Sequence, residues 1–113
     1  MLTIEALKQY GANTEEGLKR CINNEAFYLK MVNMGLDDAN FDKLQKAVTA
    51  GDAREAFEAA HTLKGIAGNL ALTPLYTPVC ELTELLRGKD EIGDVTALMG
   101  EITAQLEKIR ALM

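Results

Sequence analysis

The chain has 113 residues, a formal net charge of −5, and 48% hydrophobic residues. This length is enough for one domain with its own core, and charge that is spread without a basic run argues against nucleic acid or an anionic membrane surface as the partner. There is no signal-peptide pattern and no apolar run near the ~18 residues of a membrane span, so we expect a cytoplasmic protein.

The N-terminal third is expected to form short helices, because apolar residues recur at helical spacing and strict strand alternation is absent. A first helix runs from about Ile4 to Tyr10, with Thr3 as its N-cap and Gly11 as its stop. A second helical region starts near Thr14 and is expected to turn three apolar residues inward: Leu18, Cys21 and Ile22.

A third helix, EAFYLKMVNMGL, is predicted after an N-cap at Asn23 or Asn24. One stripe of this helix is expected to join the core: Phe27, Met31 and Met34. The next helix runs from about Asp38 to Gly51, and its predicted inward residues are Phe41, Leu44 and Val48. Asp52 then caps the longest helix, which extends from about Ala53 to Leu72.

Two further helices complete the pattern. The first begins at one of two Thr-Pro pairs, 73–74 or 77–78, because a threonine cap followed by proline is typical of a helix start. It ends at Gly88, and its predicted inward residues are Val79, Leu82, Leu85 and Leu86. The last helix begins between residues 90 and 94 and carries one apolar stripe: Val95, Leu98, Met99, Ile102, Leu106 and Ile109.

The chain is therefore predicted to be all-α. We expect a single domain over residues 1–113, in which an up-and-down antiparallel four-helix bundle covers about 38–113 and additional helices cover about 3–36. Cys21 and Cys80 lack CxxC spacing and occupy apolar positions of helical patterns, so we expect reduced thiols packed within the fold.

The stretch AHTLKGIAGNL places Gly65 and Gly68 in a helix beside the only histidine, His61. Each glycine costs about 0.5–1 kcal/mol relative to alanine, so some feature of this face favours the absence of a side chain. A turn of 100° per residue puts the core face opposite His61: Ala56, Ala59, Leu63, Ala67 and Leu70. Six residues fall within roughly 60° of His61 on the same helix: Arg54, Phe57, Glu58, Lys64, Gly65 and Gly68.

An exposed imidazole is a competent nucleophile, and Lys64 one turn away can balance an anion attached to it. One histidine without a nearby cysteine or carboxylate cluster argues against a metal site. The outer face of a helix does not enclose the pocket that a hydrolase needs, and the GxxxxGK[ST] pattern for ATP phosphates is absent. The competing interpretation is an ordinary surface histidine beside glycines that allow close helix packing, but such packing would place small residues on the core face.

The sequence HTLKGIAGNL resembles the H-x-L-K-G core of the histidine-containing phosphotransfer domains of multistep phosphorelays. The resemblance extends to EEGLKRCINNEAFYLKMV before the bundle and to CELTELLRG after the histidine helix. It implies that Nε2 of His61 accepts the phosphoryl group, that Lys64 steadies this group, and that Gly65 leaves room for a receiver domain. Arg54, Phe57 and Glu58 share this face and are candidates for receiver docking.

The sequence departs from the family pattern at two places. Family members usually have another glycine at the position of Ala71, a change that we expect to matter little because alanine is a good helix former. They often offer a polar side chain to Nδ1 of the histidine, and an ungapped match puts Thr83 there, or Glu84 if the register shifts by one.

The resemblance implies a phosphoryl carrier without ATP-dependent kinase activity. Its expected partners are the receiver domains of response regulators, with a hybrid histidine kinase as a further candidate, and we expect the carrier to be a monomer. Mg²⁺ is expected on the receiver, and no cofactor or metal is expected on this chain. Two alternatives stay open: the phosphoacceptor domain of a chemotaxis-type kinase, and a non-catalytic helical adaptor that docks a partner helix on Met31, Met34 and the aromatic residues.

Overall fold

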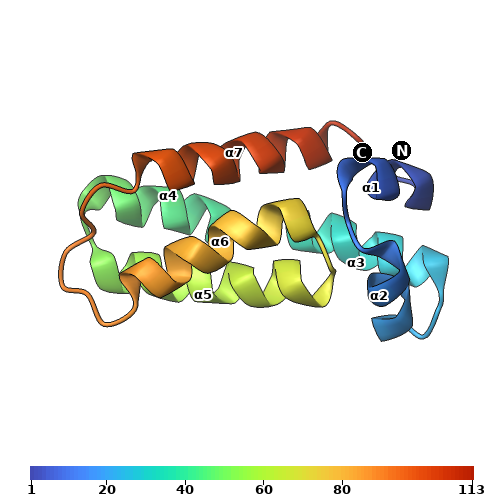
Figure 1. Cartoon of the computed structure of the whole chain (residues 1–113), viewed down its shortest axis with the longest axis horizontal. Helices are drawn as coiled ribbons and strands as arrows, with labels where there is room; N and C mark the ends of the chain where they lie inside the picture. Colours follow the sequence, from blue (N-terminus) through green and yellow to red (C-terminus); the bar gives the residue numbers. More distant parts are fainter.

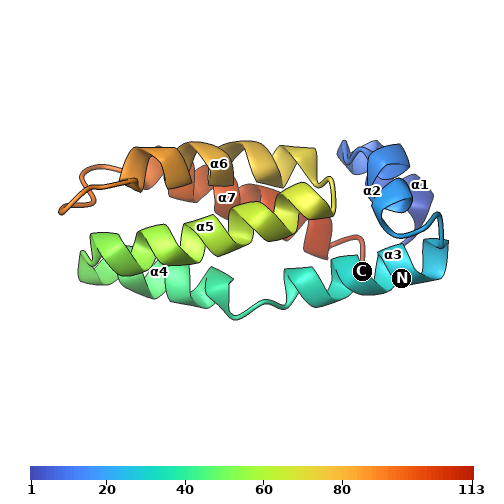
Figure 2. The same cartoon turned by 90° about the horizontal axis from the view of Figure 1, so that it is seen from below.

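The computed structural model describes all 113 residues, and the predicted all-α fold is confirmed. Four antiparallel helices, α4 to α7, lie side by side as a bundle, and three further helices pack at one end of it (Figure 1). α3 lies almost in line with α4, while α1 and α2 fold back beside α3 (Figure 2). The helices are α1 (Ile4–Tyr10), α2 (Thr14–Arg20), α3 (Glu25–Leu36), α4 (Asn40–Ala50), α5 (Ala53–Asn69), α6 (Thr73–Leu86) and α7 (Thr96–Arg110). None of them combines the length and the apolar run that crossing a membrane requires.

Polar side chains cap the starts of four of the helices, and three of these caps were predicted from the sequence. The hydroxyl of Thr3 accepts from the amide of Ala6, and the side chain of Asp52 accepts from the amide of Glu55 at 3.1 Å. Of the two candidates before α3, Asn24 is the cap. Because these acceptors satisfy amides that lack an intrahelical partner, they fix where the helices start. The fourth such cap is Asn13 at the start of α2.

The start of α6 differs from the prediction. The helix begins at Thr73 with Leu72 at the N-cap position, no side chain caps it, and Pro78 lies inside it. The hydroxyl of Thr77 donates to the carbonyl of Thr73 instead of capping an amide. Both threonines are therefore helical residues, and neither serves as the predicted N-cap.

The end of α5 also differs, because the helix stops at Asn69 and not at Leu72. The amide of Leu72 donates to the carbonyl of Ala67 at 2.9 Å, and the amide of Ala71 donates to Gly68 at 3.1 Å. These bonds form a Schellman motif whose left-handed position is Ala71, with φ = 57°. The reason for expecting alanine to matter little at position 71 does not hold, because Ala71 is left-handed and not helical, and this conformation favours glycine.

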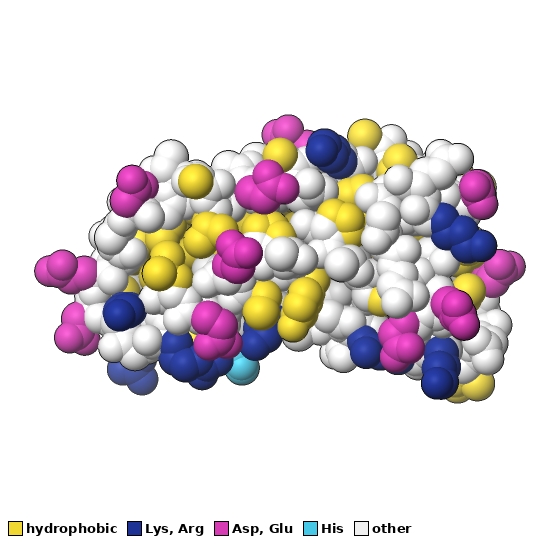
Figure 3. Space-filling model, viewed as in Figure 1, with side chains coloured by type: hydrophobic (Ala, Val, Ile, Leu, Met, Phe, Trp, Pro, Cys, Tyr) yellow, Lys and Arg dark blue, Asp and Glu magenta, His cyan; other side chains and the backbone are white.

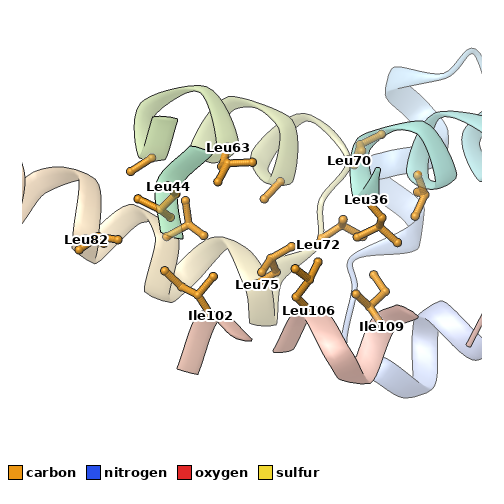
Figure 4. Close-up of a cluster of buried hydrophobic side chains, with 14 of the residues drawn as sticks. Leu36, Leu44, Leu63, Leu70, Leu72, Leu75, Leu82, Ile102, Leu106 and Ile109 are labelled. Atoms are coloured by element: carbon orange, nitrogen blue, oxygen red, sulfur yellow. The ribbon is translucent and has the colours of Figure 1, made fainter. Parts of the chain in front are cut away.

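The core runs along the inner faces of the bundle helices (Figure 4). The predicted core face of α5 is confirmed, because all five of its residues are buried: Ala56, Ala59, Leu63, Ala67 and Leu70. Leu36, Leu72 and Ile109 carry the core toward the end of the bundle where α3 lies. Cys21 is buried and Cys80 is half-buried, and both thiols are free.

Several predicted inward residues are exposed. On α3 the buried stripe is Tyr28, Val32 and Leu36, which leaves Phe27 45% and Met34 58% exposed. This shift follows from Tyr28, whose hydroxyl donates to the carbonyl of Leu70 and turns that face of α3 toward the end of the bundle. Two other residues lie outside the core for local reasons: Ile22 follows the end of α2 with φ = 58°, and Leu85 flanks the buried stripe of α6.

Candidate functional site

His61 lies in the second half of α5 with its side chain exposed to solvent. In the space-filling view the single histidine projects from the edge formed by α5, beside lysine and arginine side chains (Figure 3). The prediction that His61 faces away from the core is confirmed, because His61 is exposed while Ala59, Leu63 and Ala67 on the opposite face of α5 are buried. An exposed nitrogen at this position is open to a large partner.

The imidazole of His61 stacks on an aromatic ring one turn earlier in α5. The ring centroids of Phe57 and His61 are 5.7 Å apart, and the planes meet at 14°. The guanidinium carbon of Arg87 lies 5.1 Å from the centroid of Phe57, within the range of a cation–π contact. Phe57 therefore links the histidine to the C-terminal end of α6 and restricts the ring positions that the imidazole can take.

Lys64 follows His61 by one turn and pairs with an acidic residue of α6. Its Nζ lies 3.3 Å from Oε1 of Glu84. Arg87 donates to the same carboxylate from Nε at 3.0 Å and from Nη2 at 3.2 Å. The hydrogen bonds from Arg87 and then from Lys64 lower the pKa of Glu84 to about 2, so this carboxylate is charged at neutral pH. Two cations and one anion thus surround the approach to His61.

The two glycines near His61 have different surroundings. A Cβ at Gly65 would meet nothing within 4 Å, so the space beside the imidazole is open there. A Cβ at Gly68 would lie 3.0 Å from Cε1 of Tyr76 in α6. Gly68 therefore allows α6 to approach α5. The prediction was that both glycines leave room beside His61, and the geometry agrees with it for Gly65 but not for Gly68.

The predicted orienting residue, Thr83, does not serve His61. Its side chain is fully buried, and its hydroxyl donates to the carbonyl of Val79 at 2.8 Å. An exposed imidazole and a hydroxyl inside the bundle do not share a hydrogen bond, so this assignment is corrected. The alternative, Glu84, is exposed but hydrogen-bonds to Lys64 and Arg87.

The remaining candidates lie one and two turns before His61. Arg54 and Glu58 are exposed and form a loose i,i+4 pair with 3.7 Å between Nε and Oε1. Phe57 between them is half-buried. Such exposed pairs contribute little to stability, so these side chains are free to exchange partners when a protein docks.

An open groove of about 540 Å³ runs beside His61 toward the N-terminal helices. α5 contributes His61, Lys64 and Gly65 to its walls, and α6 contributes Tyr76. The opposite wall includes Arg20 at the end of α2. No cluster of three or more metal-ligating side chains occurs here or elsewhere in the structure. The site thus presents one nucleophile, nearby cations and open space.

Residues 37–112 match the family model described as Hpt domain. The chain belongs to the Hpt domain family. Hpt domains act in phosphotransfer during phosphorelay signalling and interact with receiver domains and histidine kinases. Comparison with curated proteins and with solved structures yields no match. The matched part of this Hpt domain comprises α4 to α7, and α1 to α3 lie outside it.

Sequence reasoning missed Arg87 and Arg20. The i,i+3 spacing of Glu84 and Arg87 indicates a pair on one helix face, but contact with Phe57 depends on how α6 is rotated against α5. Arg20 is distant in sequence from His61, and only the docking of α2 against the end of α5 brings it to the groove.

Proposed function

We propose that this chain carries phosphoryl groups on His61 between receiver domains of a phosphorelay. The observation that carries the proposal is the exposed imidazole beside the open space at Gly65, within a chain of the Hpt family. The neutral imidazole attacks the phosphorus of a receiver phosphoaspartate through Nε2. The P–O bond breaks, and its electron pair leaves with the aspartate as a carboxylate. Return of the group to another receiver reverses these steps.

Lys64 stabilises the phosphoryl group in this proposal. A phosphoryl group carries a charge of roughly −2 at neutral pH and competes with Glu84 for the ammonium of Lys64. Arg87 holds Glu84 through two hydrogen bonds, so the carboxylate keeps a cationic partner when Lys64 turns toward His61. The exchange replaces one exposed ion pair by another and therefore has a small net cost.

We further propose that the receiver supplies Mg²⁺ and most of the transition-state stabilisation, while this chain supplies the nucleophile and its cations. Under this proposal the chain needs neither ATP nor a metal of its own. The monomeric state and the cytoplasmic location stay predictions.

The experiment follows a phosphoryl group through the chain. Receiver domains from the same genome are charged with labelled acetyl phosphate, purified and mixed with the chain, and an uncharged second receiver is then added. We expect the label to move to the chain and then to the second receiver, and we expect no label from ATP. Failure of every receiver to label the chain would contradict the proposal, and labelling by an ATP-bound kinase domain alone would favour the chemotaxis-type alternative.

The adaptor alternative has one observation in its favour, which is the exposure of Phe27 and Met34 on α3. It predicts partner binding that survives loss of the histidine. Equal binding of a partner by the wild type and His61→Gln, without any phosphoryl transfer, would support the adaptor instead of the carrier.

A further inference from the structure

The C-terminal end of α5 is held by three hydrogen bonds from the N-terminal helices. A guanidinium nitrogen of Arg20 donates to the carbonyl of Gly68, and the hydroxyl of Tyr28 donates to Leu70 at 2.8 Å. The third donor is the amide of Asn13, which lies 2.9 Å from the carbonyl of Ala71. The last carbonyls of a helix lack intrahelical donors, so α2, α3 and the turn before α2 supply donors at the end of the helix that carries His61, in addition to the amide of Ala71, which donates to Gly68. These helices lie outside the matched family region.

The same N-terminal segment forms one wall of the groove beside His61. Asn13 and Arg20 line the groove together with Lys64. The charged residues that line it are Arg20 and Lys64, and no acidic residue lines it although the chain has a net charge of −5. Each of these cations pairs with a carboxylate that lies outside the lining, Arg20 with Glu16 and Lys64 with Glu84, so the lining itself carries positive and no negative side chains.

Arg20 keeps hydrogen-bonding capacity for a partner. Its Nη1 donates to Gly68, and its Nε lies 3.3 Å from Oε1 of Glu16. No hydrogen bond in the structure uses Nη2, and 45% of the side chain is exposed. A guanidinium has five N–H donors and binds carboxylates and phosphates well.

We propose that the α2 wall of this groove, which lies outside the matched family region, extends the receiver-docking surface, and that Arg20 contacts the acidic surface around the phosphoaspartate of the receiver and helps to select that receiver. The inference rests on the proposed function. A typical interface covers about 800 Å² on each partner, roughly 30 Å across. Gly68 lies only about 10 Å beyond His61 along the helix, so a receiver centred on His61 extends over Arg20. The receiver is acidic there because carboxylates hold its Mg²⁺.

Two substitutions test the charge of this wall. Asn13→Asp adds a negative charge, retains a side-chain acceptor for the amide of Glu16, and keeps the backbone donor to Ala71. Arg20→Glu reverses the charge but removes the hydrogen bond to Gly68, so it also perturbs the end of α5.

Each substitution has a matched control outside the groove. Asn24→Asp adds the same charge at another exposed N-cap, whose side chain accepts from the amide of Phe27. Arg110→Glu removes a similar bond, because Nη2 of Arg110 donates to the carbonyl of Leu36 at 2.6 Å. Neither control residue lines the groove.

The measurements are the rate of transfer from a charged receiver, the labelling of His61 by phosphoramidate, and the melting temperature. At low salt we expect Asn13→Asp to slow receiver transfer about threefold and Arg20→Glu about tenfold, while both controls transfer like the wild type. The differences should shrink at high salt, and phosphoramidate should label His61 equally in every variant that is folded.

Two results would overturn the inference while leaving the proposed function in place. Equal transfer by Asn13→Asp and Asn24→Asp would remove any role of the wall in docking. Parallel loss of phosphoramidate labelling, receiver transfer and melting temperature in Asn13→Asp would reduce the N-terminal helices to a structural role. If wild-type chain accepts label from phosphoramidate but from no receiver, the proposed function fails and this inference fails with it.

Discussion

The ammonium of Lys64 lies 3.3 Å from Glu84, so the cation nearest in sequence to the proposed phosphoacceptor is already paired. Phosphorylation of His61 therefore competes with an existing interaction and does not meet a free lysine. Arg87 contacts both Glu84 and the ring of Phe57, on which His61 stacks. The proposed chemistry at His61 is thus coupled to the end of α6.

Removal of either partner of this pair should have opposite effects on the phosphorylated protein. Lys64→Ala should shorten the lifetime of phosphohistidine about threefold at low salt, because the phosphoryl group loses a screened cationic neighbour. Glu84→Gln should lengthen it by releasing Lys64. Asp42→Asn, which breaks the exposed pair with Lys46 on α4, is the control and should leave the lifetime unchanged. A shorter lifetime in Glu84→Gln, like that in Lys64→Ala, would contradict the idea that Glu84 and the phosphoryl group compete for Lys64.

The stability that this network contributes should depend on pH only in acid. The folded pKa of Glu84 is lowered from 4.5 to about 2, so the folded state favours its charged form. The contribution is therefore complete above about pH 4.5 and is lost as the pH falls through 2. We expect the melting-temperature difference between wild type and Glu84→Gln to be constant from pH 8 to 5 and to vanish near pH 2. If the melting-temperature difference changed between pH 8 and 6, a titrating group other than Glu84 would be responsible.

Gly65 should show an opposition between stability and transfer. Gly65→Ala should raise stability by about 0.5–1 kcal/mol, since open space surrounds it, whereas Gly68→Ala should gain less because Tyr76 must move. Gly65→Gln should stay folded and accept phosphoryl groups poorly from a receiver, while phosphoramidate still labels His61. Gly100→Gln in α7 also meets open space and should leave transfer unchanged. Normal receiver transfer by Gly65→Gln would contradict the explanation that Gly65 leaves room for the receiver beside His61.

Ala71→Gly should stabilise the protein by about 1 kcal/mol. Position 71 is left-handed, and a Cβ in that conformation is unfavourable by more than the entropy that glycine costs. Ala97→Gly, within α7, is the control and should destabilise by a similar amount because its backbone is helical. Thermal melting of the two variants measures whether each substitution raises or lowers the stability. A lower melting temperature for Ala71→Gly would show that the left-handed position is not strained.

The fold could be predicted from the sequence where helical periodicity alone determines which residues of a helix are buried. The angles on α5 predicted its buried residues and the exposure of His61, because the period of an isolated helix is enough for that inference. The buried face of α3 was not predictable in this way, since contacts of Tyr28 with Leu70 and Gly17 set its rotation. Periodicity likewise does not reveal whether a glycine faces a neighbouring ring, as Gly68 does.

The sequence predicted the residues that α5 contributes to the candidate site, but it did not predict the contacts between α5 and α6. Placement of Glu84 between Lys64 and Arg87 requires the rotation of α6 against α5. An ungapped sequence match selected Thr83, but the same rotation buries that side chain inside the bundle. The resemblance to the family thus gave the proposed nucleophile, His61, without describing the interactions around it.

The central claim is that His61 alone carries the phosphoryl group, and one measurement tests it most directly. Wild type and His61→Gln are incubated with the same charged receiver, and the label on each chain is challenged with acid and with base after circular dichroism has shown equal helix content. The account predicts a label on the wild type that is lost in acid and stable in base, and no label on His61→Gln. A label on folded His61→Gln, or an acid-stable label on the wild type, would contradict it.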